Sequence, residues 1–131
     1  MNDAEALFQY RREQALLTLQ EAEKMLGENF SPRTIINRAY YAMFYMTLSL
    51  FIYKGISYST SKHTGIISLF DKEFILTNLI ERKYSKALHK MFDRRIEFDY
   101  KDFVRPMVED ARESVTAAHQ FIDAIEAYIN S

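Results

Sequence analysis

The stretch that decides the fold is residues 104–129, VRPMVEDARESVTAAHQFIDAIEAYI, because its apolar residues recur at alternating steps of four and three. Such steps put these side chains on one side of an α-helix, as in a helix packed lengthwise against neighbouring helices. We therefore predict a helix that starts near residue 102 and belongs to a helical bundle. The apolar series is Val104, Val108, Ala111, Val115, Ala118, Ile122, Ile125 and Ile129.

Four earlier helices are predicted, and their ends coincide with the few residues that start or stop helices. Asp3 is a candidate N-cap for the first helix, and Gly27 is its stop. Ser31 can cap the second helix, Pro32 suits its first position, and Gly55 ends it. No strand-like alternation is present. We predict a single domain over residues 1–131, an all-α, antiparallel (up-and-down) four-helix bundle plus one short helix. The four earlier helices cover about residues 3–26, 32–54, 62–74 and 79–98.

The bulk composition excludes several classes of protein. With 131 residues, 48% of them hydrophobic and 27% charged, the chain is typical of one folded globular domain. Its 17 basic and 18 acidic residues exclude a strongly basic nucleic-acid coat but permit a local basic patch. Cysteine is absent, which excludes disulfides, zinc fingers and cysteine nucleophiles.

No membrane segment is predicted. The N-terminus, MNDAEALFQYRR, lacks the apolar core of a signal peptide. The charge-free run over residues 39–53 is shorter than the roughly 20 residues that span a bilayer, and a buried helix explains it better. We therefore expect a cytoplasmic protein.

Two adjacent arginines in the predicted helix over residues 79–98 have different positions. Arg94 falls on a basic outer ridge with lysines 83, 86 and 90, whereas Arg95 falls within the apolar stripe. A buried guanidinium without a partner costs several kcal/mol. Arg95 therefore needs an ion pair, with Asp99 one turn later as the nearest candidate, or a packed stem whose charged head reaches solvent, or a cleft that accepts an anion such as phosphate. All three alternatives remain open. The stripe consists of Tyr84, Leu88, Met91, Arg95 and Phe98.

Two other features suggest contact with a polyanion. Residues 81–95 contain six basic and two acidic residues, an imbalance that attracts phosphate chains or is simply a solvated face. In the predicted helix over residues 32–54, one cation and two phenols share a face that could contact a nucleobase and its phosphate. The same face could instead pack at an interface. Its residues are Thr34, Arg38, Tyr41, Tyr45 and Ser49.

Histidine is sparse. His63 and Lys62 lie at the start of the predicted short helix, where free backbone N–H groups can hold a phosphate, or where both residues merely cap the helix. His89 projects away from the core, and His119 is a surface residue able to contact Asp123. No Glu-x-x-His pair, glycine-rich phosphate loop or serine elbow is present, so no metal or cofactor is predicted.

Three motifs together carry a resemblance to a known family. They are RAYYAMF at residues 38–44, KHTG at residues 62–65, and the sequence from Arg95 to Asp99 and Tyr100. In these motifs and in their order the chain resembles the HEPN (higher eukaryotes and prokaryotes nucleotide-binding) superfamily, and most closely its small stand-alone prokaryotic branch. The likeness covers almost the whole chain.

This resemblance implies an antiparallel helical bundle that dimerises, with the end of the fourth helix at the cleft between subunits. Many HEPN proteins are metal-independent ribonucleases of toxin–antitoxin, CRISPR or antiviral systems, with an arginine followed four to six residues later by a histidine. Others work with a minimal nucleotidyltransferase, which in some systems adds AMP to a tyrosine beside that motif. The chain departs from the pattern because Asp99 stands where the histidine is expected, and Tyr100 falls one place short of the modified tyrosine.

The preferred hypothesis is a homodimeric HEPN-type protein that binds a nucleotide or RNA phosphate and acts with a minimal nucleotidyltransferase, in a toxin–antitoxin-like or defence system. The first alternative is a metal-independent ribonuclease toxin that uses Arg95 and Asp99, with His63 or His89 recruited from elsewhere. The second alternative is a non-catalytic interaction module. The candidate catalytic residues are Arg95 and Asp99, and the candidate ligand-binding residues are Arg38, Tyr41, Lys62, His63, Arg94, Arg95 and Tyr100.

Overall fold

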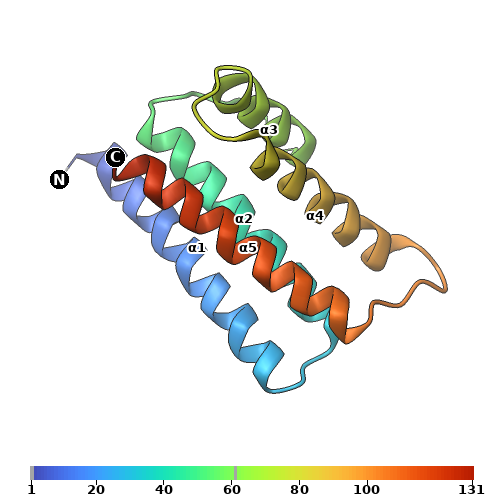
Figure 1. The fold of residues 1–131 in the computed structure, drawn as a ribbon. Helices are drawn as coiled ribbons and strands as arrows, with labels where there is room; N and C mark the ends of the chain where they lie inside the picture. The colour runs from blue at the N-terminus through green and yellow to red at the C-terminus, as the bar shows by residue number, and fades with distance from the viewer. Residues whose placement is uncertain (1, 61) are drawn as a thin grey trace.

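The computed structural model describes residues 2–60 and 62–131, and the secondary structure in these ranges is entirely helical (Figure 1). Four long helices run alternately down and up the bundle, and both ends of the chain lie at the same end of it. The predicted all-α, up-and-down bundle with one short helix is therefore confirmed. The elements are α1 (Asp3–Gly27), α2 (Pro32–Tyr53), α3 (His63–Phe70), the π-helical turn η1 (Asp71–Ile75), α4 (Arg82–Tyr100) and α5 (Val108–Ile129).

Helix α2 is the centre of the bundle. It packs against α1, α5 and α4, and it buries side chains on almost every side. Tyr40, Met43 and Leu50 are fully buried on it. The apolar series predicted for α5 packs against α2 from Ala111 to Ile129. Burial of this apolar surface stabilises the fold, at roughly 25 cal/mol for each Å² removed from water.

The last helix starts later than predicted. It begins at Val108, not near residue 102, and residues 101–107 form an irregular connection in which Phe103 takes a left-handed φ of 63°. Pro106 explains the difference, because proline disfavours the helical conformation of the residue before it. The carboxylate of Asp110 then accepts a hydrogen bond of 2.8 Å from the backbone N–H of Met107, the N-cap.

The short helix also differs from the prediction. It ends at Phe70 and passes into η1, where the N–H of Leu76 donates to the carbonyl of Asp71 over five residues. The Asp71 carboxylate accepts a hydrogen bond from Ser85 and pairs with His89 at 2.7 Å, so this wider turn is held against α4. Helix α4 begins at Arg82, three residues later than expected, and ends two residues later, at Tyr100.

The structure bears on two further expectations from the sequence. Asn2, not Asp3, caps α1, and its side-chain oxygen accepts from the N–H of Glu5 at 2.8 Å. Across residues 2–60 and 62–131, no helix combines the length and the apolar character that crossing a bilayer requires.

The two glycines predicted to stop helices play different roles, which gives a matched test of the fold. Gly55 has a φ of 67°, whereas Gly27 remains inside α1, and Asn29 takes the left-handed φ of 59° after it. We expect Gly55→Ala to lower the free energy of unfolding by about 1 kcal/mol, because an alanine is strained at positive φ. Gly27→Ala should leave it unchanged or raise it by about 0.5 kcal/mol. Urea unfolding measures both, and equal losses would contradict this assignment.

Candidate functional site

The guanidinium of Arg95, on α4, lies over a set of aromatic rings. Its Cζ atom is 5.1 Å from the centre of the Tyr40 ring, 5.6 Å from that of Tyr41 and 5.8 Å from that of Phe92. Two of these rings come from α2, so the contact joins α4 to the central helix. A cation over ring faces is stabilised by the ring quadrupole, by about 0.5–2 kcal/mol according to how far it is desolvated.

Arg95 is not neutralised by a carboxylate. No ion pair between Arg95 and Asp99, or any other acidic side chain, is present in the part of the chain that the structure describes. Its Nε atom is buried without a hydrogen-bond partner there. Of the three alternatives left open by the sequence, the structure therefore gives no support to the intrahelical ion pair. The positive charge is available to an anion.

A second arginine reaches the same tyrosine. The Cζ atom of Arg38, on α2, is 5.6 Å from the centre of the Tyr41 ring, and its Nη2 donates to Asn37 at 3.3 Å. Two guanidinium groups thus share one ring, although like charges repel. An anion bound beside Tyr41 would relieve that repulsion. Both arginines can offer a phosphate a planar fork of N–H donors.

His63 joins this cluster from the start of α3. Its Nδ1 and the Tyr40 hydroxyl share a hydrogen bond of 2.6 Å, and its ring stacks on Phe44 with the centres 4.0 Å apart. Burial, and secondarily the charge of Arg95, lower the pKa of His63 from 6.5. Burial raises the pKa of Tyr40 well above its usual range, against a smaller lowering effect of Arg95. Both side chains are therefore neutral near pH 7.

The KHTG motif is explained by packing around this histidine. A Cβ atom added to Gly65 would lie 2.7 Å from Cγ2 of Thr60, so the helix start can approach the preceding loop only with glycine there. The Thr60 hydroxyl accepts from the N–H of Lys62 at 3.0 Å. Lys62 itself is exposed at the N-cap position of α3, next to His63. The motif thus fixes the place where the histidine enters the cluster.

Arg94 lies differently from the prediction, because its side chain is not on an exposed ridge. The side chain is 14% exposed and reaches across to α5. It donates to the carbonyl of Asp110 at 3.1 Å, to the hydroxyl of Ser114 at 3.0 Å and to the carboxylate of Glu113 at 3.1 Å. Through these contacts Arg94 links α4 to α5. They leave it little freedom to bind a ligand.

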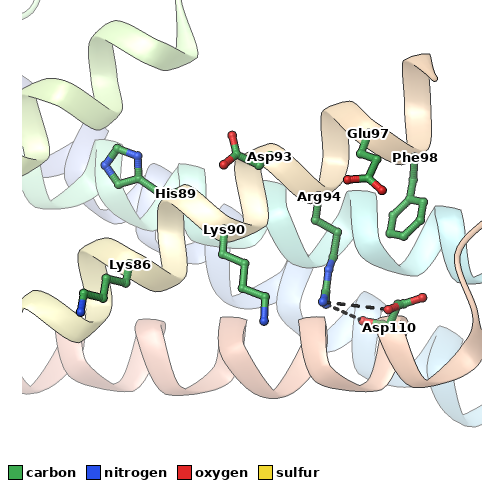
Figure 2. Close-up of a pocket in the computed structure, with 8 residues that line it drawn as sticks. All are labelled: Lys86, His89, Lys90, Asp93, Arg94, Glu97, Phe98 and Asp110. Atoms are coloured by element: carbon green, nitrogen blue, oxygen red, sulfur yellow. Dashed lines mark hydrogen bonds and ion pairs between the residues drawn. The ribbon is translucent and has the colours of Figure 1, made fainter. Parts of the chain in front are cut away.

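A hollow of about 550 Å³ lies beside Arg94, between α4 and α5 (Figure 2). Figure 2 shows Lys86 and Lys90 along it and Arg94 directed at Asp110. Carboxylates of Asp93, Glu97 and Asp110 also line the hollow, so its charges largely cancel. It is a weaker anion site than the aromatic cluster around Arg95.

The remaining predicted residues lie at the end of α4. Asp99 and Tyr100 line a separate hollow of about 290 Å³ beside the connection to α5. Asp99 is partly buried, and Tyr100 is 72% exposed. The structure therefore brings together Arg38, Tyr41, His63 and Arg95. It places Lys62 beside the cluster, Asp99 and Tyr100 next to it along the chain, and Arg94 elsewhere.

Tyr40, Phe44 and Phe92 belong to the cluster but were not predicted as site residues. Tyr40 is fully buried in a helix that is apolar nearly all round, so no single face of that helix marked it out. One signal was available, because a buried tyrosine normally needs a hydrogen-bond partner for its hydroxyl. Among the other histidines, His89 pairs with Asp71, and His119 contacts Asp123 at 3.2 Å, as predicted.

The sequence of this chain is similar to those of known proteins. The model of the HEPN domain family matches residues 8–128. The chain belongs to the HEPN family. A UPF0332 protein of Thermotoga maritima is 35% identical over 98% of this chain and 96% of its own length. Two Methanocaldococcus jannaschii proteins named as candidate toxins are 32% and 28% identical, over 86% and 91% of this chain and 85% and 79% of their own lengths.

The adjacent arginines provide a test of this assignment. Arg94→Met should lower the free energy of unfolding by about 2 kcal/mol, because it removes charged hydrogen bonds to α5. Arg95→Met should cost less than about 1 kcal/mol, since the lost ring contacts are offset by removal of a buried N–H group without a partner. Thermal and urea unfolding of both variants give the comparison. Equal losses would mean that Arg95 is as structural as Arg94.

Proposed function

We propose that this protein binds an RNA or nucleotide phosphate at the cluster around Arg95, as a HEPN protein of the toxin–antitoxin type. One observation carries the proposal: a partly buried guanidinium rests on three aromatic rings with no carboxylate within the described ranges to neutralise it. A bound phosphate supplies the missing negative charge. Arg38, which contacts the same Tyr41 ring as Arg95, is the second donor.

Single-stranded RNA suits this surface. Unstacked bases bind to aromatic and guanidinium faces, and the half-buried Tyr41 and Arg38 offer one of each. Lys62 is exposed beside His63 and adds a cation for a neighbouring phosphate. Such contacts would depend on salt, because each neutralised phosphate releases counterions. The proposed ligand would be met in the cytoplasm, the location expected from the sequence.

Homodimerisation is part of the proposal. Three large apolar side chains are exposed at the end of α4 and in the connection after it: Tyr100 at 72%, Phe103 at 104% and Met107 at 72%. Exposed apolar side chains gathered in one region favour association with another protein surface. A second copy here would bring two Arg95 clusters toward one cleft, so that a single RNA strand could contact both.

A minimal nucleotidyltransferase is the proposed partner. Two relatives are named as candidate toxins, and a toxin needs a neutralising partner encoded with it. A gene for a minimal nucleotidyltransferase beside the gene for this chain would support the pairing.

The binding proposal predicts that the affinity for RNA depends on one side chain. Single-stranded RNA should bind with an affinity that falls as salt rises, and Arg95→Met should weaken binding at least about tenfold. The control is Arg112→Gln, which removes the same charge from an exposed side chain of α5 that pairs with Glu109. Fluorescence anisotropy measures both. Unchanged binding in the Arg95 variant would remove this cluster from the site, and no salt-dependent binding by the wild type would favour a non-catalytic interaction module.

Expression in cells tests the toxin part separately. We expect the wild-type chain expressed alone to arrest growth, and co-expression with the nucleotidyltransferase to relieve the arrest. The Arg95→Met variant should fold but should not arrest growth, because the site would no longer hold the phosphate. Growth curves, with the amount of soluble protein as the control, provide the measurement. Arrest by the Arg95 variant at the wild-type level would contradict the proposal.

A further inference from the structure

The outward side of α1 carries large apolar side chains that the described structure leaves exposed. Helix α1 packs against α2 and α5, and it lies on the opposite edge of the bundle from α4 (Figure 1). Leu7 is 47% exposed, Tyr10 is 62% exposed and Leu17 is 59% exposed, and their spacing places them on one side of the helix. A hollow of about 480 Å³ lies on the same side, with Gln14, Leu17 and Glu21 among its lining residues. These five residues form what we call the α1 face.

Arg11 lies beside the α1 face without a negative partner. Its Cζ atom is 5.7 Å from the centre of the Tyr10 ring, and its Nη1 donates to the Gln14 side chain at 2.9 Å. Its Nε is buried without a hydrogen-bond partner, and Arg11 makes no ion pair within residues 2–60 and 62–131. Helix α2, the main packing partner of α1, contains no acidic residue. An aromatic ring and an amide therefore hold the guanidinium at this face, where a carboxylate from another molecule could neutralise it.

The α1 face also carries the matching negative group. Glu21 is exposed and makes no ion pair among the described residues. It lies about 15 Å from Arg11 along the helix axis, with Leu17 between them. When two copies of α1 lie antiparallel, with a two-fold axis beside Leu17, Arg11 of each copy comes level with Glu21 of the other. A surface that is complementary to itself in this way fits a closed contact between two copies of one chain.

We infer that the α1 face is a self-association surface, on which a second copy of this chain packs antiparallel and Arg11 of each copy pairs with Glu21 of the other. Near the axis, Leu17 packs against Leu17 of the second copy, and Gln14 lies next to Thr18 of the second copy. Burial of the exposed apolar side chains supplies most of the favourable free energy. The two ion pairs fix the register and the antiparallel direction.

This contact is separate from the homodimer contact proposed at the end of α4, because α1 and α4 lie on opposite edges of the bundle (Figure 1). A chain that uses both contacts assembles beyond a dimer, whereas a chain that uses the α1 contact alone forms a dimer. In either case, loss of the α1 contact reduces the mass of the assembly to about half or less. The inference does not depend on RNA binding.

Reversal of the two charges tests the pairing. Arg11→Glu and Glu21→Arg should each weaken self-association at least about tenfold, because each change places like charges opposite each other in both pairs. An equimolar mixture of the two variants should associate as the wild type does, because opposite charges again face each other in both pairs. The matched control is Lys83→Glu, which makes the same reversal on an exposed side chain of α4 and should leave the mass unchanged. Sedimentation velocity at several protein concentrations measures the mass.

The mixture also controls for folding, because variants that fail to fold could not restore association in each other. Wild-type association in both single variants would overturn the inference, and so would a mixture that associates no better than its components. Leu17→Asp, in the centre of the face, should lower the mass of the purified chain. If it instead keeps the wild-type mass and loses binding to a co-expressed minimal nucleotidyltransferase, the inference is overturned and the α1 face belongs to that partner. None of these outcomes changes the RNA binding that the proposed function requires.

Discussion

The contact between the Arg95 guanidinium and the Tyr40 ring is the interaction on which the site depends. It lies where α4 meets the central helix, and the hydroxyl at the other end of the same tyrosine holds His63 at the start of α3. One fully buried side chain thus sets the relative positions of three helices. A phenylalanine there could fill the same space, but it would leave the imidazole without its hydrogen bond.

The energetic balance at this contact differs from that of an ordinary buried arginine. A carboxylate partner would neutralise Arg95 and lower the cost of burying it, but it would also occupy the position that a phosphate needs. Ring faces give a weaker attraction and leave the charge in place. The cost of this arrangement is the burial of the Nε–H group without a hydrogen-bond partner. That cost is small compared with the several kcal/mol needed to bury an unpaired charge in purely apolar surroundings. The neighbouring Arg94, with charged and carbonyl partners on α5, shows the alternative solution.

The sequence predicted the fold well because the relevant signals are local. The steps of four and three up to Ile129, and the Ser31–Pro32 pair, reflect helical geometry and capping within a few residues. The site was only partly predicted, because its contacts join residues that lie far apart in the sequence. Arg95 stood out because it interrupts a stripe, but two of the three rings that it contacts, Tyr40 and Tyr41, lie on α2, and no spacing within α4 reveals them. The same limit applied to Arg94, whose partners lie on α5, the next helix along the chain.

The adjacency of Arg94 and Arg95 has a consequence for how this protein can change over evolution. One side chain ties α4 to α5 and the other ties it to α2, so α4 is fixed about its own axis from two directions. Adding or deleting one residue earlier in α4 would rotate both arginines by about 100° and break both attachments. Length changes should therefore accumulate in the irregular connection at residues 101–107, and α4 should vary by substitution only.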